Sequence, residues 1–134
     1  MATVAAGPFD VSLKPLTPYD AAPDARIGRM SLDKTYRGDL AATSIGEMLS
    51  AATATAGSAA YVAIERVTGT LGGRRGAFVL YHRATMTRGA PDLRIAVVPD
   101  SGTGELAGLA GTMHIDIADG KHSYRFEYQF ADTP

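Results

Sequence analysis

The feature that most constrains the fold of this chain is a strict alternation of aromatic and polar side chains near its C-terminus. Residues 122–130 read HSYRFEYQF, and one face carries His122, Tyr124, Phe126, Tyr128 and Phe130. Successive side chains of a β-strand point to opposite faces, so this alternation predicts a half-buried strand with its aromatic side chains inward. A second alternating run covers 112–118, and Asp119-Gly120 separates the two runs. Such a dipeptide favours a tight turn, which predicts a C-terminal β-hairpin.

Earlier segments also have the character of strands. The expected strands are 9–13, 26–38, 59–71, 73–86 and 92–98. Gly72-Gly73 joins two of them in a further hairpin. The first is expected to end at Pro15, because proline cannot donate to a sheet ladder. Pro15, Pro18 and Pro23 then mark a connecting loop.

The alanine-rich segment 39–60 is ambiguous by local rules. Ser44-x-x-Glu47 has the spacing of a helix capping box, and apolar residues from Ile45 to Ala52 follow a helical period. Gly46 and the threonine-rich tail of the segment disfavour a helix. Local propensity alone therefore leaves a short helix and a strand open.

Composition limits the classes of function. The 134 residues carry a formal net charge of -1, with 46% hydrophobic and 20% charged residues. These values are typical of one globular domain over 1–134, without a disulfide or metal to support it. A nucleic-acid binder usually carries an excess of basic residues, and this chain has none. Neither its charge nor any apolar run indicates a membrane partner. The absence of cysteine and of a signal-like N-terminus leads us to expect a cytoplasmic protein.

Many short strands without alternating helices predict an all-β sandwich or barrel. A small open sheet would expose two long edges, and closure removes them. We therefore expect a closed antiparallel barrel.

Several motifs together resemble an uncharacterised family of small bacterial proteins. They are Ser31-Leu32-Asp33-Lys34 ahead of Gly38-Asp39-Leu40, then TSIGEMLSA, YVAIERVTGTLGGRRGAFVLYH and VVPDSGTGELAGLAG. The resemblance covers the chain from about Phe9 to Phe130. It implies a closed antiparallel eight-stranded barrel of the allene oxide cyclase-like type, in which 39–56 form a strand. It implies no activity and supplies no catalytic residues, since a shared shape is not a shared function.

Familiar catalytic and cofactor motifs have simpler explanations here. Gly102-x-Gly104-x-x-x-Gly108 lacks the following helix that a phosphate site needs, so it predicts a turn. The histidines, His82, His114 and His122, do not have metal-site spacing, and we predict neither a metal nor a cofactor. The chain contains no G-x-S-x-G nucleophile motif.

Glu65 and His82 are the candidate polar groups of the interior. Each lies in step with apolar residues of its own strand, and the register that joins Ala63 and Val67 to the core brings both into the lumen. A buried carboxylate there should be neutral, paired with His82, or bonded to a hydroxyl such as that of Tyr124 or Tyr128. The alternative is a purely structural pair, or a residue near the barrel mouth.

Three functions follow from this expected lumen. The first is the binding of a small apolar ligand, for which the candidate ligand-binding residues are Glu65, His82, Phe78, Leu80, Tyr124, Phe126 and Tyr128. The second is a structural or interaction protein with a filled lumen. The third is an isomerase or cyclase that uses Glu65 and His82 as acid and base. We rank them in that order.

A homo-oligomer, most simply a dimer, is the expected assembly. If Glu65 and His82 look inward, then Val62, Ile64, Val79 and Tyr81 look outward. A contiguous apolar patch of this kind usually marks an interface.

Overall fold

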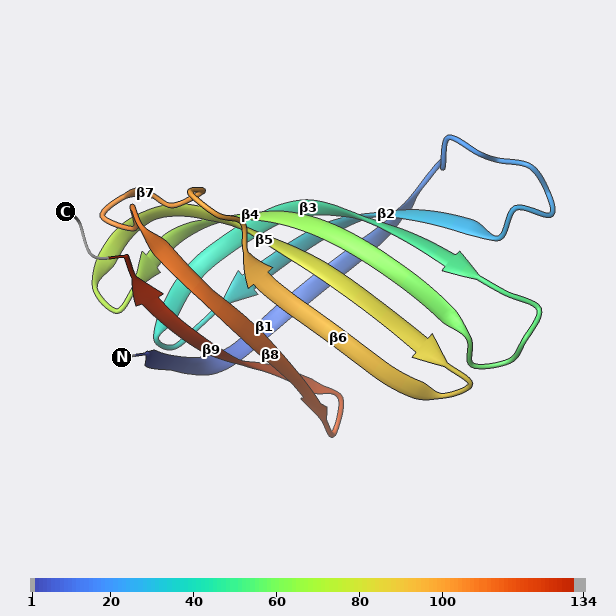
Figure 1. Cartoon of the computed structure of the whole chain (residues 1–134). Helices are drawn as coiled ribbons and strands as arrows, with labels where there is room; N and C mark the ends of the chain where they lie inside the picture. The colour runs from blue at the N-terminus through green and yellow to red at the C-terminus, as the bar shows by residue number, and fades with distance from the viewer. Residues whose placement is uncertain (1, 132–134) are drawn as a thin grey trace.

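A closed antiparallel barrel of eight long strands makes up this protein (Figure 1). The structure is a computed structural model that describes residues 2–131. The strands are β1 (Thr3–Leu16), β2 (Ile27–Tyr36), β3 (Leu40–Ala52), β4 (Ala59–Leu71), β5 (Arg74–Thr87), β6 (Ala90–Val97), β8 (Leu109–Ala118) and β9 (Lys121–Phe130), with the short β7 (Thr103–Gly104) beside β5. Each long strand pairs with the next along the chain, and β9 returns to β1. No helix forms within 2–131, and hence none that could cross a membrane.

The segment with two local interpretations is a strand. β3 pairs along its length with β2 on one side and β4 on the other. These ladders satisfy its backbone and override the helical spacing of its apolar residues. The strand ends at Ala52, four residues before the limit that the family resemblance implied.

The first strand is longer than predicted. The expected segment, 9–13 with an end at Pro15, lies inside β1, which passes through Pro8 and Pro15. β1 pairs with β9 as far as Phe9, and beyond that point β2 is its one neighbour in the described part of the chain. Pro15 therefore lies on an open edge, where a missing N–H is tolerated.

The predicted tight turn at the end of the chain is present. Asp119 and Gly120 have φ values of 53° and 74°, which is the left-handed conformation of a two-residue hairpin turn. The aromatic side chains of β9 point inward from this hairpin, and Tyr124 and Phe126 are buried.

The two ends of the barrel differ in packing. At the filled end lie the connections 37–39, 72–73 and 98–108, and a tight aromatic and aliphatic cluster occupies the lumen there. At the open end lie the connections 17–26, 53–58, 88–89 and 119–120. In Figure 1 the filled end is on the left and the open end is on the right.

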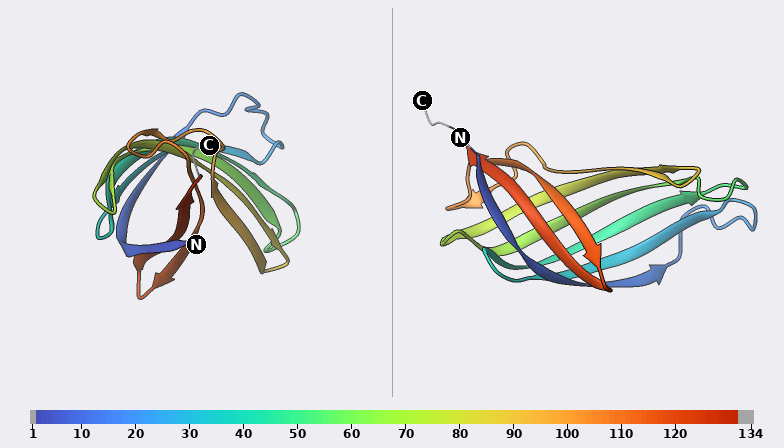
Figure 2. Two further views of the ribbon diagram at one scale, coloured as in Figure 1. Left: turned by 60° about the vertical axis from the view of Figure 1, so that its left-hand side comes forward. Right: turned by 90° about the horizontal axis from the view of Figure 1, so that it is seen from below.

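The barrel closes through one short seam. β6 and β8 pair only at Ile95 with Met113 and at Ala96 with Thr112. Toward the open end the two strands diverge, as the left view of Figure 2 shows. We call the short pairing, together with the diverging strand ends beyond it, the β6–β8 seam.

Candidate functional site

A pocket of about 540 Å³ occupies the lumen at the open end. Its walls are mostly apolar and include Phe9, Leu32, Met48, Ala63, Ala84 and Ile115. Four large apolar side chains at its mouth, Leu13, Met86, Leu93 and Ile117, are between 43% and 66% exposed. Leu93 and Ile117 come from the two strands of the β6–β8 seam. The pocket is thus a largely apolar chamber with an apolar rim.

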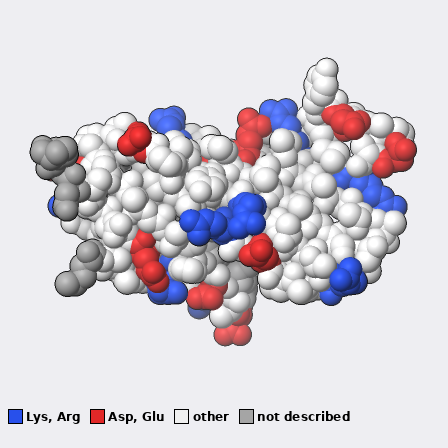
Figure 3. Space-filling model, in the orientation of Figure 1, with Lys and Arg blue, Asp and Glu red and all other residues white. Residues whose placement is uncertain are grey.

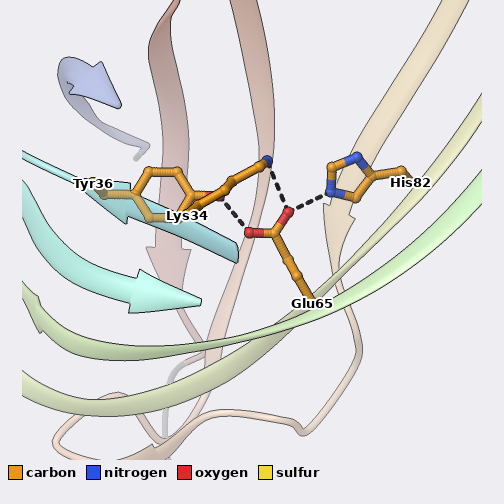
Figure 4. Close-up of polar contacts among 4 residues, drawn as sticks. All are labelled: Lys34, Tyr36, Glu65 and His82. Carbon is orange, nitrogen blue, oxygen red and sulfur yellow. Dashed lines mark hydrogen bonds and ion pairs between the residues drawn. The ribbon is translucent and has the colours of Figure 1, made fainter. Parts of the chain in front are cut away.

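A cluster of four polar side chains lies where the pocket meets the filled end (Figure 4). Glu65 is fully buried and accepts three hydrogen bonds. Its Oε2 accepts from Lys34 Nζ at 2.9 Å and from His82 Nε2 at 2.6 Å, and its Oε1 accepts from Tyr36 Oη at 2.5 Å. We call these four residues the floor cluster.

The register of three strands brings the floor cluster together. Gly46 on β3 pairs with Leu32 on β2 and with Glu65 on β4. The side chains of Lys34 and Tyr36 of β2 reach across β3 to the carboxylate. Gly46 lets the backbone of β4 come close to β3 at Glu65. His82 of β5 is two residues from Leu80, the direct partner of Glu65.

The electrostatics of the floor cluster favour an ionised carboxylate. Burial works to raise the pKa of Glu65, but the hydrogen bond from His82, the charge of Lys34 and the hydroxyl of Tyr36 outweigh it and hold the pKa at about 2. Burial, followed by the negative charge of Glu65, raises the pKa of Tyr36 far above its ordinary value. Tyr36 therefore keeps its proton and donates a hydrogen bond to the carboxylate.

Lys34 is unusual because its ammonium group is buried beside aromatic rings. Its side chain is 4% exposed, and Nζ lies 5.0 Å from the ring centre of Phe9 and 5.6 Å from that of Tyr36. The negative faces of aromatic rings attract a cation at such distances. The ammonium group is thus in contact with the carboxylate of Glu65 and lies near two aromatic rings.

The predicted meeting of Glu65 and His82 inside the barrel is present in the structure. The other predicted ligand-binding residues lie elsewhere. Phe78, Leu80, Tyr124, Phe126 and Tyr128 pack in the cluster at the filled end and are not among the residues that line the pocket. His122 also belongs to the inward face of β9, but it lies at the open end of that strand and lines the pocket.

Of the alternatives expected for Glu65, the pairing with His82 is present, but the hydroxyl that bonds to the carboxylate does not come from Tyr124 or Tyr128. Tyr36 provides it, whereas Tyr124 Oη donates to the carbonyl oxygen of Arg37 at 2.7 Å and accepts from Leu40 N at 2.8 Å. Tyr124 lies too far toward the filled end, where it bonds the turn between β2 and β3 from inside. Glu65 is also charged rather than neutral, because its partners supply three donors.

Sequence reasoning missed Lys34 and Tyr36. The signal was available, since Leu32, Lys34 and Tyr36 alternate in step and all three are buried. A lysine between two apolar residues of an inward face marks a buried charge that needs a partner, and Glu65 was the candidate carboxylate.

The chemistry of this arrangement centres on the ring of His82. An ionised carboxylate only accepts hydrogen bonds, so Nε2 of His82 carries the proton toward Glu65. Within 2–131 no group of three or more histidine or acidic side chains gathers as metal ligands would. His114 and Asp116 are exposed on β8.

The comparisons with known proteins identify the family without naming an activity. The chain is 51% identical to a protein of unknown function from Shewanella oneidensis MR-1, whose crystal structure matches with a TM-score of 0.94 over 99% of this chain and 100% of that one. That protein is described as a member of the DUF3224 family. No curated protein matches the chain. The family description "Protein of unknown function (DUF3224)" matches residues 5–128, and the chain therefore belongs to the DUF3224 family.

Proposed function

We propose that this protein binds one small, mainly apolar molecule in the pocket at the open end of its barrel. The observation that carries the proposal is the volume of about 540 Å³ inside a lumen that is otherwise tightly packed. Pockets for small molecules usually enclose a few hundred cubic ångströms and are lined mainly by apolar groups.

The contrast between the two halves of the lumen supports binding over a filled barrel. An eight-stranded barrel is just narrow enough for side chains to fill it, and protein interiors leave few voids. Small side chains keep the open end hollow, namely Ser50, Ala59, Ala63 and Ala84. At the filled end the corresponding space contains large side chains such as Tyr36, Phe78 and Phe126.

The exposed rim supports the same function. Leu13, Met86, Leu93 and Ile117 leave apolar surface in contact with water. A bound apolar molecule would cover part of that surface and gain roughly 25 cal/mol for each Å² removed from water.

An isomerase or cyclase is the second candidate, and one observation favours it. Glu65 orients the ring of His82, so that the neutral ring presents a free acceptor nitrogen. This pairing is typical of a carboxylate that positions a histidine base. Glu65 itself has a pKa of about 2 and three hydrogen bonds, which suits an orienting role better than the donation of a proton.

We propose the cytoplasm as the compartment, since a chain without cysteine suits a reducing environment. Antibodies or a tag detected in fractionated cells would test this.

The binding proposal is tested with phenylnaphthylamine, an apolar probe that fluoresces when it leaves water. We expect saturable binding of one probe per chain. Ala84→Phe places a ring into the pocket and should weaken binding about tenfold or more, equivalent to about 1.4 kcal/mol. Ala41→Phe is the matched control, because Ala41 is exposed on the outside of β3 and away from the pocket.

Two results would overturn the proposal. One is the absence of saturable binding by the native chain, and the other is equal binding by Ala84→Phe and native protein. Circular dichroism confirms that each variant is folded. Ala59→Phe provides a second variant, because Ala59 is exposed at the rim of the pocket and in step with the inward-facing Tyr61 and Ala63.

A further inference from the structure

The groups that the floor cluster presents to the pocket are Lys34 and His82. Both line the pocket, whereas Glu65 and Tyr36 lie behind them. Lys34 Nζ donates one hydrogen bond to the residues of 2–131, to Glu65. An ammonium group has three N–H donors, so Lys34 can still donate to a ligand at the bottom of the pocket.

His82 provides a second site beside it. Its Nε2 bonds to Glu65, and the other ring nitrogen points away from Glu65 in Figure 4. That nitrogen, Nδ1, has no hydrogen-bond partner in the part of the chain that the structure describes. It accepts a proton when the ring is neutral and donates when the ring is charged.

The charges of the floor cluster decide which ligand head group fits. Lys34 contributes one positive charge and Glu65 one negative charge, so the cluster is neutral when His82 is neutral. A cationic head group would meet Lys34 and bury a net charge. A carboxylate alone would also bury a net charge, but a carboxylate that arrives with one proton leaves the site neutral.

We propose that the ligand is a monocarboxylic acid with an apolar body, bound together with one proton. One carboxyl oxygen accepts a hydrogen bond from Lys34 Nζ, and the other shares the proton with Nδ1 of His82. The apolar body lies along the alanine-lined wall toward the rim. This inference rests on the proposed ligand-binding function and adds the class of ligand.

Few other titratable groups face the ring of His82. Tyr61 of β4 lies with its ring centre 6.3 Å from that of His82, and burial raises its pKa, so it stays neutral. Asp92 of β6 and His122 of β9 line the same pocket. Asp92 is exposed, and His122 packs against Phe9. The proton therefore has one alternative acceptor, His122, which the experiment tests separately.

The head-group preference is measured by displacement of phenylnaphthylamine with octanoate, octanol and octylamine, which share one apolar chain. We expect octanoate to bind about tenfold more tightly than octanol, because a carboxylate oxygen accepts a stronger hydrogen bond from the ammonium group of Lys34 than a hydroxyl oxygen does. Octylamine should bind more weakly than either. Lys34→Gln should bring the affinities for octanoate and octanol to within about twofold of each other. Circular dichroism and binding of the probe report whether this variant is folded and still has its pocket.

The outcomes separate this inference from the function on which it rests. If octanol displaces the probe and octanoate does so no better, the proposal of a carboxylic acid as the ligand is overturned, and the proposal of ligand binding stands. If the probe itself does not bind, the binding function is overturned, and this inference with it.

The number of protons taken up on binding is measured by calorimetry. Octanoate is titrated above neutral pH in two buffers that have different enthalpies of ionisation. We expect uptake of about one proton per octanoate. His82→Gln should reduce the uptake to near zero, and His122→Gln should leave it unchanged. No uptake by the native protein, or its loss in His122→Gln instead of His82→Gln, would overturn the assignment.

Discussion

Glu65 is a carboxylate without exposed surface that is surrounded by donors from two other strands. Removing one partner of such a buried pair leaves an uncompensated charge, at a cost of several kcal/mol. Lys34 and His82 therefore matter for stability even before a ligand binds. The same contacts keep Glu65 ionised to low pH.

Because Glu65 has a low pKa, we expect the folded state to lose stability in acid. Its folded pKa of about 2 lies below the ordinary 4.5, so its contribution is present above pH 4.5 and is lost as the pH falls through 2. This lowering of the pKa corresponds to roughly 3 kcal/mol. Urea unfolding between these pH values should show this loss in the native protein and a flatter profile in Glu65→Gln.

Exposed ion pairs such as that of Arg37 with Asp10 are present in both proteins and cancel in this comparison. Parallel profiles for the native chain and Glu65→Gln would mean that Glu65 is not held ionised.

At the scale of single elements, β3 provides the space in which the floor cluster forms. A Cβ atom added to Gly46 would lie 2.0 Å from the carbonyl oxygen of Ile64 and 2.7 Å from Cα of Glu65. Both neighbours belong to the backbone of β4, so neither can rotate away. The close approach of β3 and β4 at this point therefore requires glycine.

Gly46→Ala should destabilise the protein by about 1–3 kcal/mol, because it forces these strands apart. It should also weaken octanoate binding, since Glu65 shifts with β4. Ala41→Val is the matched control on the outer face of the same strand and should change stability by less than about 0.5 kcal/mol. Urea unfolding measures both variants, and native-like stability of Gly46→Ala would contradict the assigned close approach.

The β6–β8 seam has the shortest pairing of any two neighbouring long strands in the barrel wall. Residues 90–94 of β6 pair with β5 but have no partner on the other side among residues 2–131, because the pairing with β8 begins at Ile95. Strand edges with few contacts open locally more readily than the rest of a sheet.

Hydrogen exchange should therefore be faster at 90–94 than in β3, which is paired on both sides. Mass spectrometry of exchanged peptides can compare the two segments. A bound apolar probe should slow the exchange at 90–94, because Leu93 lines the pocket. Equal rates in the two segments would show that the seam does not open.

At the scale of the whole molecule, the outside of the barrel carries its own apolar surface. Ile45, Leu49, Val62 and Ile64 project from neighbouring positions of β3 and β4 and are 49% to 65% exposed. Tyr81 of β5 is paired with Ile64 and is partly exposed. Charges of both signs are scattered over the face seen in Figure 3, so no extended area of one sign is visible there.

We expect this outer patch to join two copies of the chain. Light scattering at micromolar concentration should give the mass of a dimer, since a patch of this kind is rarely left in water. Ile64→Glu should shift the mass to that of a monomer. Val4→Glu, at an exposed apolar position of β1, should leave the dimer intact. A monomeric native chain would contradict the expectation.

Local properties of the sequence determined most of the strands. Alternation over 122–130 placed Tyr124 and Phe126 inside, and Asp119-Gly120 produced the turn before them. The register of one hairpin, joined at Gly72-Gly73, was enough to bring Glu65 and His82 together. These features depend on residues that are close along the chain, which is why a single sequence reveals them.

The tertiary structure alone decided what lies around that pair. Lys34 and Tyr36 reach Glu65 across β3, and this contact depends on the register of three strands. Which half of the lumen is filled depends likewise on side chains from all the long strands. Alternation states only that a side chain points inward. Its height along the barrel, and therefore its neighbours, follows from how the whole sheet closes.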